Sequence, residues 1–546
     1  MTEDRTGFQK KQLIILGAGI MQGPAITLAG EMGLETVAVD GDPHAPWASR
    51  ADRFEHIDLK DKEGVEALAR SLQKGGRLGG IMTAGTDFSA TVAWTAERLG
   101  LPGIPYEAAL NASDKERMRR CFHAAGIPAP QFVILKTPPG RDFSLPFSYP
   151  AVVKPVDNMG GRGCRRVDSP VDLEAAVPDA LRFSRSGRVI VEEYLDGPEF
   201  SVDALVFRGE IAICGLADRH IFFPPYFIEM GHTMPAALDA ASSEALLAAF
   251  KEGVRSLGLA GPDSFGAAKG DLKLTSGGPR IGEIAARLSG GYMSGWTYPY
   301  ASGVEVTRGA IMAALGRFPQ NLAPVRSWTS AERAFISIPG KVRSFHGLDE
   351  ARTMPHVKDL FLRAGIGGRV AFPENNVAKC GNVITAAATR ESAVKAADSA
   401  VRSIRIRLEA PDAETDAFLG LAPGAPPAGK GFPPDAFSLT RTLAAMLSVL
   451  PESTISPGFP SGLPGTFIVP FPAFTESDLR DYQGRTIEES LEAVRDITGF
   501  PLPFGTEAKA LLLGRAFWVA LVRGGYQGAA YYVDRYFQAE RQMRRQ

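Results

Sequence analysis

The segment from Lys269 to Gly291 constrains the fold more than any other, because it has the pattern of a β-hairpin whose register can be counted. Two strand-like runs flank a Ser-Gly-Gly turn, and each run carries one carboxylate, Asp271 or Glu283. A three-residue loop over 276–278 would place these carboxylates opposite each other, because side chains alternate along a strand. A two-residue loop would break that register and put them on opposite faces. We expect the three-residue loop and a facing pair.

An arginine, Arg287, follows this hairpin. Two facing carboxylates with a downstream arginine can hold Mg²⁺ and a polyphosphate together. The alternative is a surface hairpin with scattered charge. The hairpin alone does not distinguish a metal and phosphate site from a surface hairpin. The distinction depends on the rest of the chain.

The composition sets limits on the kind of protein. A chain of 546 residues suggests three or four domains, and 45% hydrophobic with 22% charged residues is an ordinary globular mixture. The formal net charge of -1 gives no global field that would recruit nucleic acid or an anionic membrane. We therefore predict neither partner.

Cysteines and apolar runs indicate the compartment. The four cysteines are scattered without a CxxC pair, which argues against a disulfide framework or a cysteine zinc site. The first residues are polar, and no apolar run reaches the ~18 residues of a membrane span. We expect a cytoplasmic protein.

Residues 11–105 alternate between strand and helix patterns, which predicts a doubly wound α/β domain with a parallel sheet. Gly17 and Gly19, with Asp40 after the second strand, are similar to a dinucleotide fingerprint. Gln22 and Gly23 do not complete that fingerprint. We therefore interpret the glycines as a tight turn that opens a helix.

A glycine-rich loop follows the strand that ends at Lys154. Gly160, Gly161 and Gly163 would let backbone amides approach phosphate oxygens, and Lys154, Arg162 and Lys115 could add positive charge. The Walker A pattern is absent from this loop. The alternative is a mobile surface turn.

The run from Val189 to Leu205 has a β-branched strand that leads into acids. A strand end with a free backbone edge can read adenine through main-chain hydrogen bonds, and a later acid, Glu199, can take two ribose hydroxyls. The alternative is an acidic loop between strands.

The order of these pieces resembles the ATP-grasp superfamily of ligases over roughly residues 10–410. Residues 331–408 are similar to the C-terminal piece of its amino-acid ligase branch, and the carbamoyl-phosphate-synthase-like branch is also close. The resemblance implies an α/β fold in which a doubly wound pre-ATP-grasp domain precedes the two-lobed, α+β ATP-grasp fold. The expected divisions are a pre-ATP-grasp domain at 10–112, an ATP-grasp domain at 113–330 (small lobe about 127–200, large lobe 200–330), a C-terminal part of the ligase core at 331–410, a Pro/Gly-rich linker at 411–433 and an extra segment at 434–546.

The resemblance also implies roles for individual residues. Arg287 would act at the reacting phosphate, and His232 would contact the acceptor or transfer a proton. A structural histidine is the alternative for His232. The implied ATP-binding residues are Lys115, Lys154, Gly160, Gly161, Arg162, Gly163, the hinge Glu192, Glu193, Tyr194 and Leu195, and the ribose ligand Glu199, with Asp271 and Glu283 as metal ligands.

One position departs from the family pattern. Many members read Glu-x-Asn-x-Arg at the second metal strand, but here Ala285 stands in place of the asparagine. One metal ligand is therefore missing. A water could fill the position, because Mg²⁺ normally keeps several, or one of two metal ions could bind weakly.

The implied reaction joins a carboxylate to an amine, with an amino acid as the expected substrate. It uses ATP and Mg²⁺, with Mn²⁺ as a substitute, and proceeds through an acyl phosphate to an amide, ADP and phosphate. Carbamoyl-phosphate or purine-biosynthesis chemistry is one alternative. An ATP-binding regulatory protein without catalysis is another, which Ala285 and the extra segment motivate.

The extra segment at 434–546 resembles nothing that we recognise. Phe517, Trp518 and Val519 indicate a packed helix rather than a free surface. The segment could cap the active site, mediate dimerisation or bind a partner. A homodimer is therefore one expectation for the assembly.

Overall fold

The computed structural model describes residues 11–140, 143–421, 432, 434–448, 468–470, 479–499, 509–511 and 514–543. The chain divides into two compact units. The first contains residues 1–332 and 386–394, and the second contains residues 333–385 and 395–546.

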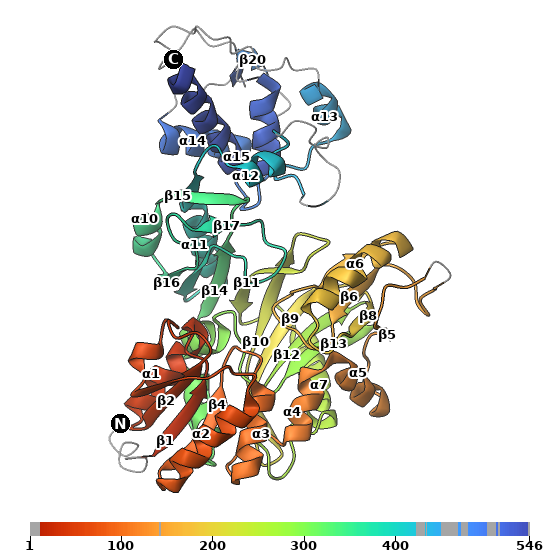
Figure 1. The fold of residues 1–546 in the computed structure, drawn as a ribbon, viewed down its shortest axis with the longest axis vertical. Helices are drawn as coiled ribbons and strands as arrows, with labels where there is room; N and C mark the ends of the chain where they lie inside the picture. The colour runs from red at the N-terminus through yellow and green to blue at the C-terminus, as the bar shows by residue number, and fades with distance from the viewer. Residues whose placement is uncertain are drawn as a thin grey trace. The chain divides into compact units, whose positions relative to one another are not determined.

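A four-stranded parallel sheet with the order β3-β2-β1-β4 opens the first unit. Successive side chains of β1 face opposite sides of this sheet. Leu13 and Ile15 pack with α1 and α9, whereas Ile14 and Leu16 pack with α2 and α3. Figure 1 shows β1, β2 and β4 together with α1, α2 and α3. This confirms the doubly wound prediction. The elements are β1 (Gln12–Leu16), α1 (Gly23–Glu31), β2 (Glu35–Asp40), β3 (Arg53–His56), α2 (Lys62–Lys74), β4 (Leu78–Thr83), α3 (Ser89–Leu99) and α9 (Val306–Ala314).

In the glycine turn after β1, backbone N–H groups donate hydrogen bonds to side chains of the same chain. The Ala18 N–H donates to Asp40 Oδ2 at 2.7 Å, and the Gly19 N–H donates to Gln22 Oε1 at 3.0 Å. Gly17 has φ 96°, and a Cβ there would lie 2.8 Å from the Gln22 side chain. Asp40 and Gln22 thus hold a tight turn, as we interpreted it.

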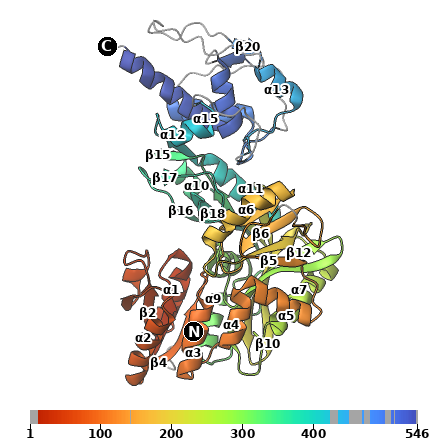
Figure 2. The same ribbon diagram turned by 45° about the vertical axis from the view of Figure 1, so that its right-hand side comes forward.

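A second, antiparallel sheet has the order β5-β8-β6-β7. Val153 and Val191 on one of its faces pack against Ala176 and Val177 of α6, which covers that face (Figure 2). The elements are β5 (Phe132–Leu135), β6 (Ala151–Pro155), β7 (Arg165–Val167), α6 (Pro170–Phe183) and β8 (Val189–Glu193).

A large antiparallel sheet with the order β13-β12-β9-β10-β11 follows. One face buries Val202, Leu272 and Ile284 against helices α4, α5 and α7. The alternate residues of β9, β12 and β13 face the other way and include the two predicted metal ligands. The elements are α4 (Tyr106–Ser113), α5 (Lys115–Ala124), β9 (Glu199–Phe207), β10 (Glu210–Phe222), β11 (Ile228–Met234), α7 (Ala240–Ser256), β12 (Phe265–Thr275) and β13 (Gly278–Ala285).

The β12–β13 hairpin corrects our loop prediction. Thr275 pairs with Gly278, so the turn has two residues and not three. That turn alone would misplace the carboxylates, but the register shifts between Asp271 and Leu272, because Gly282 is an extra residue on β13. Glu283 therefore still pairs with Asp271. The facing pair is present, and a β-bulge rather than the loop length produces it.

The second unit holds strands of two sheets. β18 (Gly381–Ala387) pairs with β16 (Val357–Leu362), and a three-stranded sheet has the order β17-β15-β19. The other elements are β14 (Thr329–Phe335) and α11 (Arg390–Ser403), which both start in the first unit, and β15 (Gly340–His346), α10 (Leu348–Thr353), β17 (Arg369–Val370), β19 (Arg405–Leu408) and α12 (Ala413–Phe418). α12 lies within the stretch 411–433 that we assigned to a linker. The second half of that stretch is mostly outside the described residues.

The C-terminal segment packs on the second unit's own sheet. Helices α14 (Ile487–Thr498) and α15 (Gly514–Met543) share a core that includes Phe517, Trp518 and Val494, which confirms the packed helix. α15 is interrupted at Gly525 (φ 58°, ψ -147°). The segment also contains α13 (Arg441–Ser448), β20 (Ile468–Pro470) and β21 (Lys509–Leu511).

Two side chains of α15 form hydrogen bonds with backbone groups at the outer edge of β19. The Ile406 N–H donates to the Tyr526 hydroxyl at 2.6 Å, and Gln527 Nε2 donates to the Ile406 carbonyl at 3.3 Å. Asp534 further along the helix accepts two hydrogen bonds from Arg407, at 2.8 and 2.5 Å. α15 thus covers the edge of the three-stranded sheet.

In the described residues, no helix combines the length and the apolar character needed to cross a membrane.

Candidate functional site

The facing carboxylates lie among cations, on the face of the large sheet that points away from α4, α5 and α7. Asp271 is buried and accepts a hydrogen bond from Ser201 Oγ at 2.7 Å. Its Oδ2 also forms an ion pair with Lys269 and lies 3.4 Å from Arg219 Nη1. Burial raises the pKa of Asp271, but Arg219 and Lys269 lower it to about 2. Asp271 is therefore ionised at any physiological pH.

Glu283, the second carboxylate, is more open, with 35% of its side chain exposed. Lys115 Nζ lies 3.4 Å from Glu283 Oε1 and donates to the Asn158 carbonyl at 2.8 Å. Burial raises the pKa of Glu283, whereas Lys115 and then Lys269 lower it, and the net shift is downward. The structure thus brings Lys115 to the predicted metal pair.

Two carboxylates suit one Mg²⁺ ion, which completes its octahedral shell with waters and phosphate oxygens. Among the described residues, there is no group of three or more His, Cys, Asp or Glu side chains that could hold a metal ion. Asp271 and Glu283 would hold such an ion from one side.

A buried triad lies next to this pair. Lys154 Nζ and Arg119 Nε each lie 2.7 Å from one oxygen of Glu192. Burial raises the pKa of Glu192, but Arg119 and Lys154 lower it to about 2. Both carboxylate oxygens of Glu192 are thus paired with cations inside the protein. Adenine recognition at this strand would therefore rely on backbone groups.

Arg119 was missed by our reading of the sequence. Its side chain is completely buried, and its Nη2 donates to the carbonyl of Gly282, the bulge residue, at 2.6 Å. It therefore connects the predicted hinge strand with the predicted metal strand. The available signal was its spacing, because it follows Lys115 by one helical turn and so shares its face.

The other hinge residues lie at the end of β8. The Glu193 N–H donates to the Gln131 carbonyl at 2.9 Å, and Leu195 is half-buried. The ring of Tyr194 lies 4.9 Å from the Arg166 guanidinium and 5.2 Å from Lys273 Nζ. Tyr194 therefore joins β7, β8 and β12 through cation–π contacts.

Glu199, the predicted ribose ligand, is held by two cations. Arg219 Nη1 lies 2.9 Å from Oε2, and Lys273 Nζ lies 3.2 Å from Oε1. Arg219 also pairs with Glu229 at 2.9 Å. The same guanidinium thus connects Glu199 with Asp271 and Glu229.

The glycine-rich loop lies between β6 and β7. Gly160, Gly161 and Gly163 all have positive φ values, of 69°, 73° and 66°. Arg162 Nη1 donates to Asn158 Oδ1 at 3.0 Å and to the Met159 carbonyl at 3.1 Å. The guanidinium of Arg162 therefore bonds within its own loop. The same loop supplies the carbonyl of Asn158 that accepts from Lys115.

His232 is buried between two carboxylates. Its Nδ1 lies 3.1 Å from Glu332 Oε2, and its Nε2 lies 3.5 Å from Glu229 Oε2. Burial lowers the pKa of His232, but Glu229 and Glu332 raise it to about 9. The imidazole is thus protonated at neutral pH, so it could donate a proton there but could not accept one. Glu332 is a second residue that we missed.

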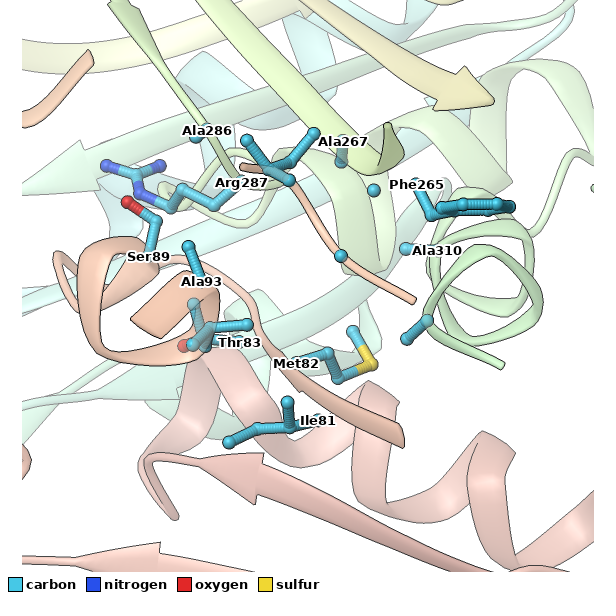
Figure 3. Close-up of a pocket in the computed structure, with 15 residues that line it drawn as sticks. Ile81, Met82, Thr83, Ser89, Ala93, Phe265, Ala267, Ala286, Arg287 and Ala310 are labelled. Atoms are coloured by element: carbon cyan, nitrogen blue, oxygen red, sulfur yellow. The ribbon is translucent and has the colours of Figure 1, made fainter. Parts of the chain in front are cut away.

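Arg287 lies at one end of a small cavity, near Ser89 (Figure 3). Its Nη1 donates to the Leu288 carbonyl at 3.0 Å, and its buried Nε has no hydrogen-bond partner among the described residues. The cavity holds about 40 Å³ between apolar side chains such as Met82 and Phe265. At ~10–15 Å³ per water on this measure, the cavity has room for about three water molecules.

The turn after Arg287 is fixed by buried groups. Asp203 accepts a hydrogen bond from the Ser289 N–H at 2.9 Å and another from its hydroxyl. Burial raises the pKa of Asp203 to about 6, although the Ser289 bonds oppose this shift. The Gly85 N–H donates to the Leu288 carbonyl at 3.2 Å, so the loop after β4 borders this turn.

Two family models match the chain. Residues 147–263 match the ATP-grasp domain, and residues 334–409 match the L-amino acid ligase C-terminal domain 2. These matches show an ATP-grasp domain that is followed along the chain by an L-amino acid ligase C-terminal domain.

Individual relatives agree with this assignment. The chain is 26% identical to the uncharacterized protein y4rH of Sinorhizobium fredii, over 68% of this chain and 77% of the relative. It is 26% identical to carnosine synthase 1 of Gallus gallus over 68% of this chain, but this covers 43% of that longer protein. The crystal structure of an L-amino acid ligase from Bacillus licheniformis superposes with a TM-score of 0.63 and 23% identity, over 73% of this chain and 99% of the other. This last likeness shows the fold.

Proposed function

We propose that the protein is an ATP-dependent carboxylate–amine ligase that acts on an amino acid. A substrate carboxylate attacks the γ-phosphate of ATP, and ADP leaves. An amine then attacks the acyl phosphate, which gives an amide and phosphate. The observation that carries this proposal is the Asp271–Glu283 pair, set beside Lys115 on an ATP-grasp frame that continues into an amino-acid ligase domain.

The residues meet the demands of this reaction. ATP and a carboxylate are both anionic, so their approach requires positive charge that is fixed in advance. Lys115 and Lys154 lie where they could hold phosphate oxygens, and Asp271 with Glu283 would hold Mg²⁺, which neutralises phosphate charge. Arg287 could grip the acyl phosphate with two parallel hydrogen bonds.

Two further steps concern water and the acceptor. The Gly160–Gly163 loop would close over the phosphates, because an acyl phosphate hydrolyses readily. The charged imidazole of His232, with Glu229 and Arg219, would orient the acceptor amino acid. A cytoplasmic location, a homodimer and the domain boundaries given above complete the proposal.

The test is a screen for ADP release across pairs of amino acids, with bicarbonate as the competing substrate and mass detection of products. Amide formation with an amino-acid pair is the expected result. Release of ADP with bicarbonate alone would favour carbamoyl-phosphate or purine-type chemistry. ATP binding without ADP release under any pair would favour a regulatory protein.

Isotope transfer tests the intermediate. Oxygen-18 placed in the substrate carboxylate should appear in the released phosphate, because the carboxylate oxygen attacks phosphorus. Label that stays entirely in the amide product and unreacted acid would rule out the acyl phosphate.

A further inference from the structure

Lys269 occupies an unusual place beside the proposed metal ligands. It precedes Asp271 by two residues on β12, so both side chains lie on the same face of the sheet. Its ammonium forms an ion pair with Asp271 Oδ2, and 14% of the side chain is exposed. This ammonium is therefore built into the carboxylate pair rather than into the surface.

The partner of Lys269 across the hairpin is Ala285. Asp271 and Glu283 form the adjacent cross-strand pair, so the four side chains make a square on one face. Two corners are carboxylates, the third is an ammonium and the fourth is a buried methyl group. An asparagine at position 285 would present an oxygen at this corner, whereas Ala285 presents none.

The other neighbour of Lys269 is Asp203 on β9. Both oxygens of Asp203 already accept hydrogen bonds from Ser289. Asp271 therefore provides the direct ion pair for Lys269. Glu283 is also close enough for its charge to be influenced by Lys269.

We propose that this site takes one divalent cation and that the ammonium of Lys269 supplies the charge of a second one. The inference rests on the proposed function, because it assumes that the pair binds a metal–nucleotide complex. A lysine ammonium is a compact point charge on a long stem, which suits the role of a fixed cation next to two carboxylates. Lys269 and Ala285 act together in this proposal, because the ammonium replaces a second ion at a place where position 285 provides no oxygen ligand.

The first test counts Mn²⁺ ions bound per chain in the presence of a non-hydrolysable ATP analogue, by electron paramagnetic resonance. Wild type, Lys269→Met and Ala285→Asn should each bind one ion. The double variant regains an oxygen ligand and loses the competing ammonium, so it should bind two ions with a spin-coupled signal. Arg280→Met, on the same hairpin away from the square, serves as the control and should bind one.

The second test separates a charge role from a structural role. Lys269→Met removes a cation that competes with the metal, so half-saturation by Mg²⁺ should occur at roughly tenfold lower concentration. The same variant loses fixed charge at the transition state, so kcat should fall by roughly 10². A residue that only maintains the fold would weaken metal binding and kcat together.

The Mn²⁺ count of the wild-type protein tests both the inference and the proposed function. Two Mn²⁺ ions in the wild-type protein would overturn the inference and leave the proposed ligase function in place. This measurement does not depend on whether any variant folds. No binding of nucleotide and Mn²⁺ to the wild type would overturn the proposed function, and the inference with it.

Discussion

The site region of the first unit and the C-terminal segment of the second unit both bury polar side chains, but they satisfy them differently. In the site region, charge is paired with charge, as in the triad of Glu192 with Arg119 and Lys154. In the C-terminal segment, Tyr526 and Gln527 satisfy backbone groups of a strand edge. Leaving a buried charge unpaired costs more than leaving a buried amide unpaired, so the two regions should respond unequally to mutation.

The largest effect is expected for Arg119→Met. The change leaves the completely buried Glu192 with one cation and frees the Gly282 carbonyl, so the free energy of unfolding should fall by about 3–5 kcal/mol. Urea denaturation would measure this. Arg120→Met is the matched control, because Arg120 is next on the same helix with 68% of its side chain exposed, and it should change little. Equal losses in the two variants would contradict the pairing of buried charges.

Arg287→Ala separates catalysis from stability. If Arg287 has the proposed role, turnover should fall by roughly 10²–10³, because the variant loses one fixed charge at the reacting phosphate. Binding of ATP, measured by calorimetry, should stay nearly unchanged. Turnover like that of the wild type would refute the role of Arg287.

His232 should make the stability of the first unit depend on pH. Its pKa is raised to about 9 in the folded protein, so its stabilising contribution is complete below the ordinary value near 6.5. That contribution, about 3 kcal/mol, is lost as the pH rises from about 6.5 to 9. Thermal melts of the wild type and His232→Gln across this range should show the slope in the wild type alone.

The smallest effect is expected in the C-terminal segment. Tyr526→Phe removes the acceptor of the Ile406 N–H and should lower the free energy of unfolding by about 1–3 kcal/mol. Turnover per folded molecule should not change. A loss as large as that of Arg119→Met would erase the difference between the two regions.

The sequence predicted parts of the arrangement where chemistry restricts residue types. The doubly wound sheet followed from periodicity, and the structure brings Lys115, Asp271 and Glu283 together. The hairpin shows the limit of such reasoning. The predicted loop was wrong, and the facing pair depends on a bulge at Gly282, which no turn rule marks.

Contacts between distant segments could not be predicted from the sequence, for a physical reason. Arg119 meets Glu192 and Gly282, and His232 meets Glu332, only after the chain has folded. Residues 434–546 were harder still. Edge coverage by Tyr526 and Gln527 uses side chains that many sequences could supply, so it leaves no recognisable motif.

The cover that α15 places on β19 has a consequence for how the protein behaves outside its native state. A strand edge with free N–H and carbonyl groups is a template for pairing with another chain. If α15 detaches, Ile406 would offer such an edge, and molecules could join through β19 into sheets that extend from one molecule to the next. By covering this edge, α15 should oppose aggregation through β19.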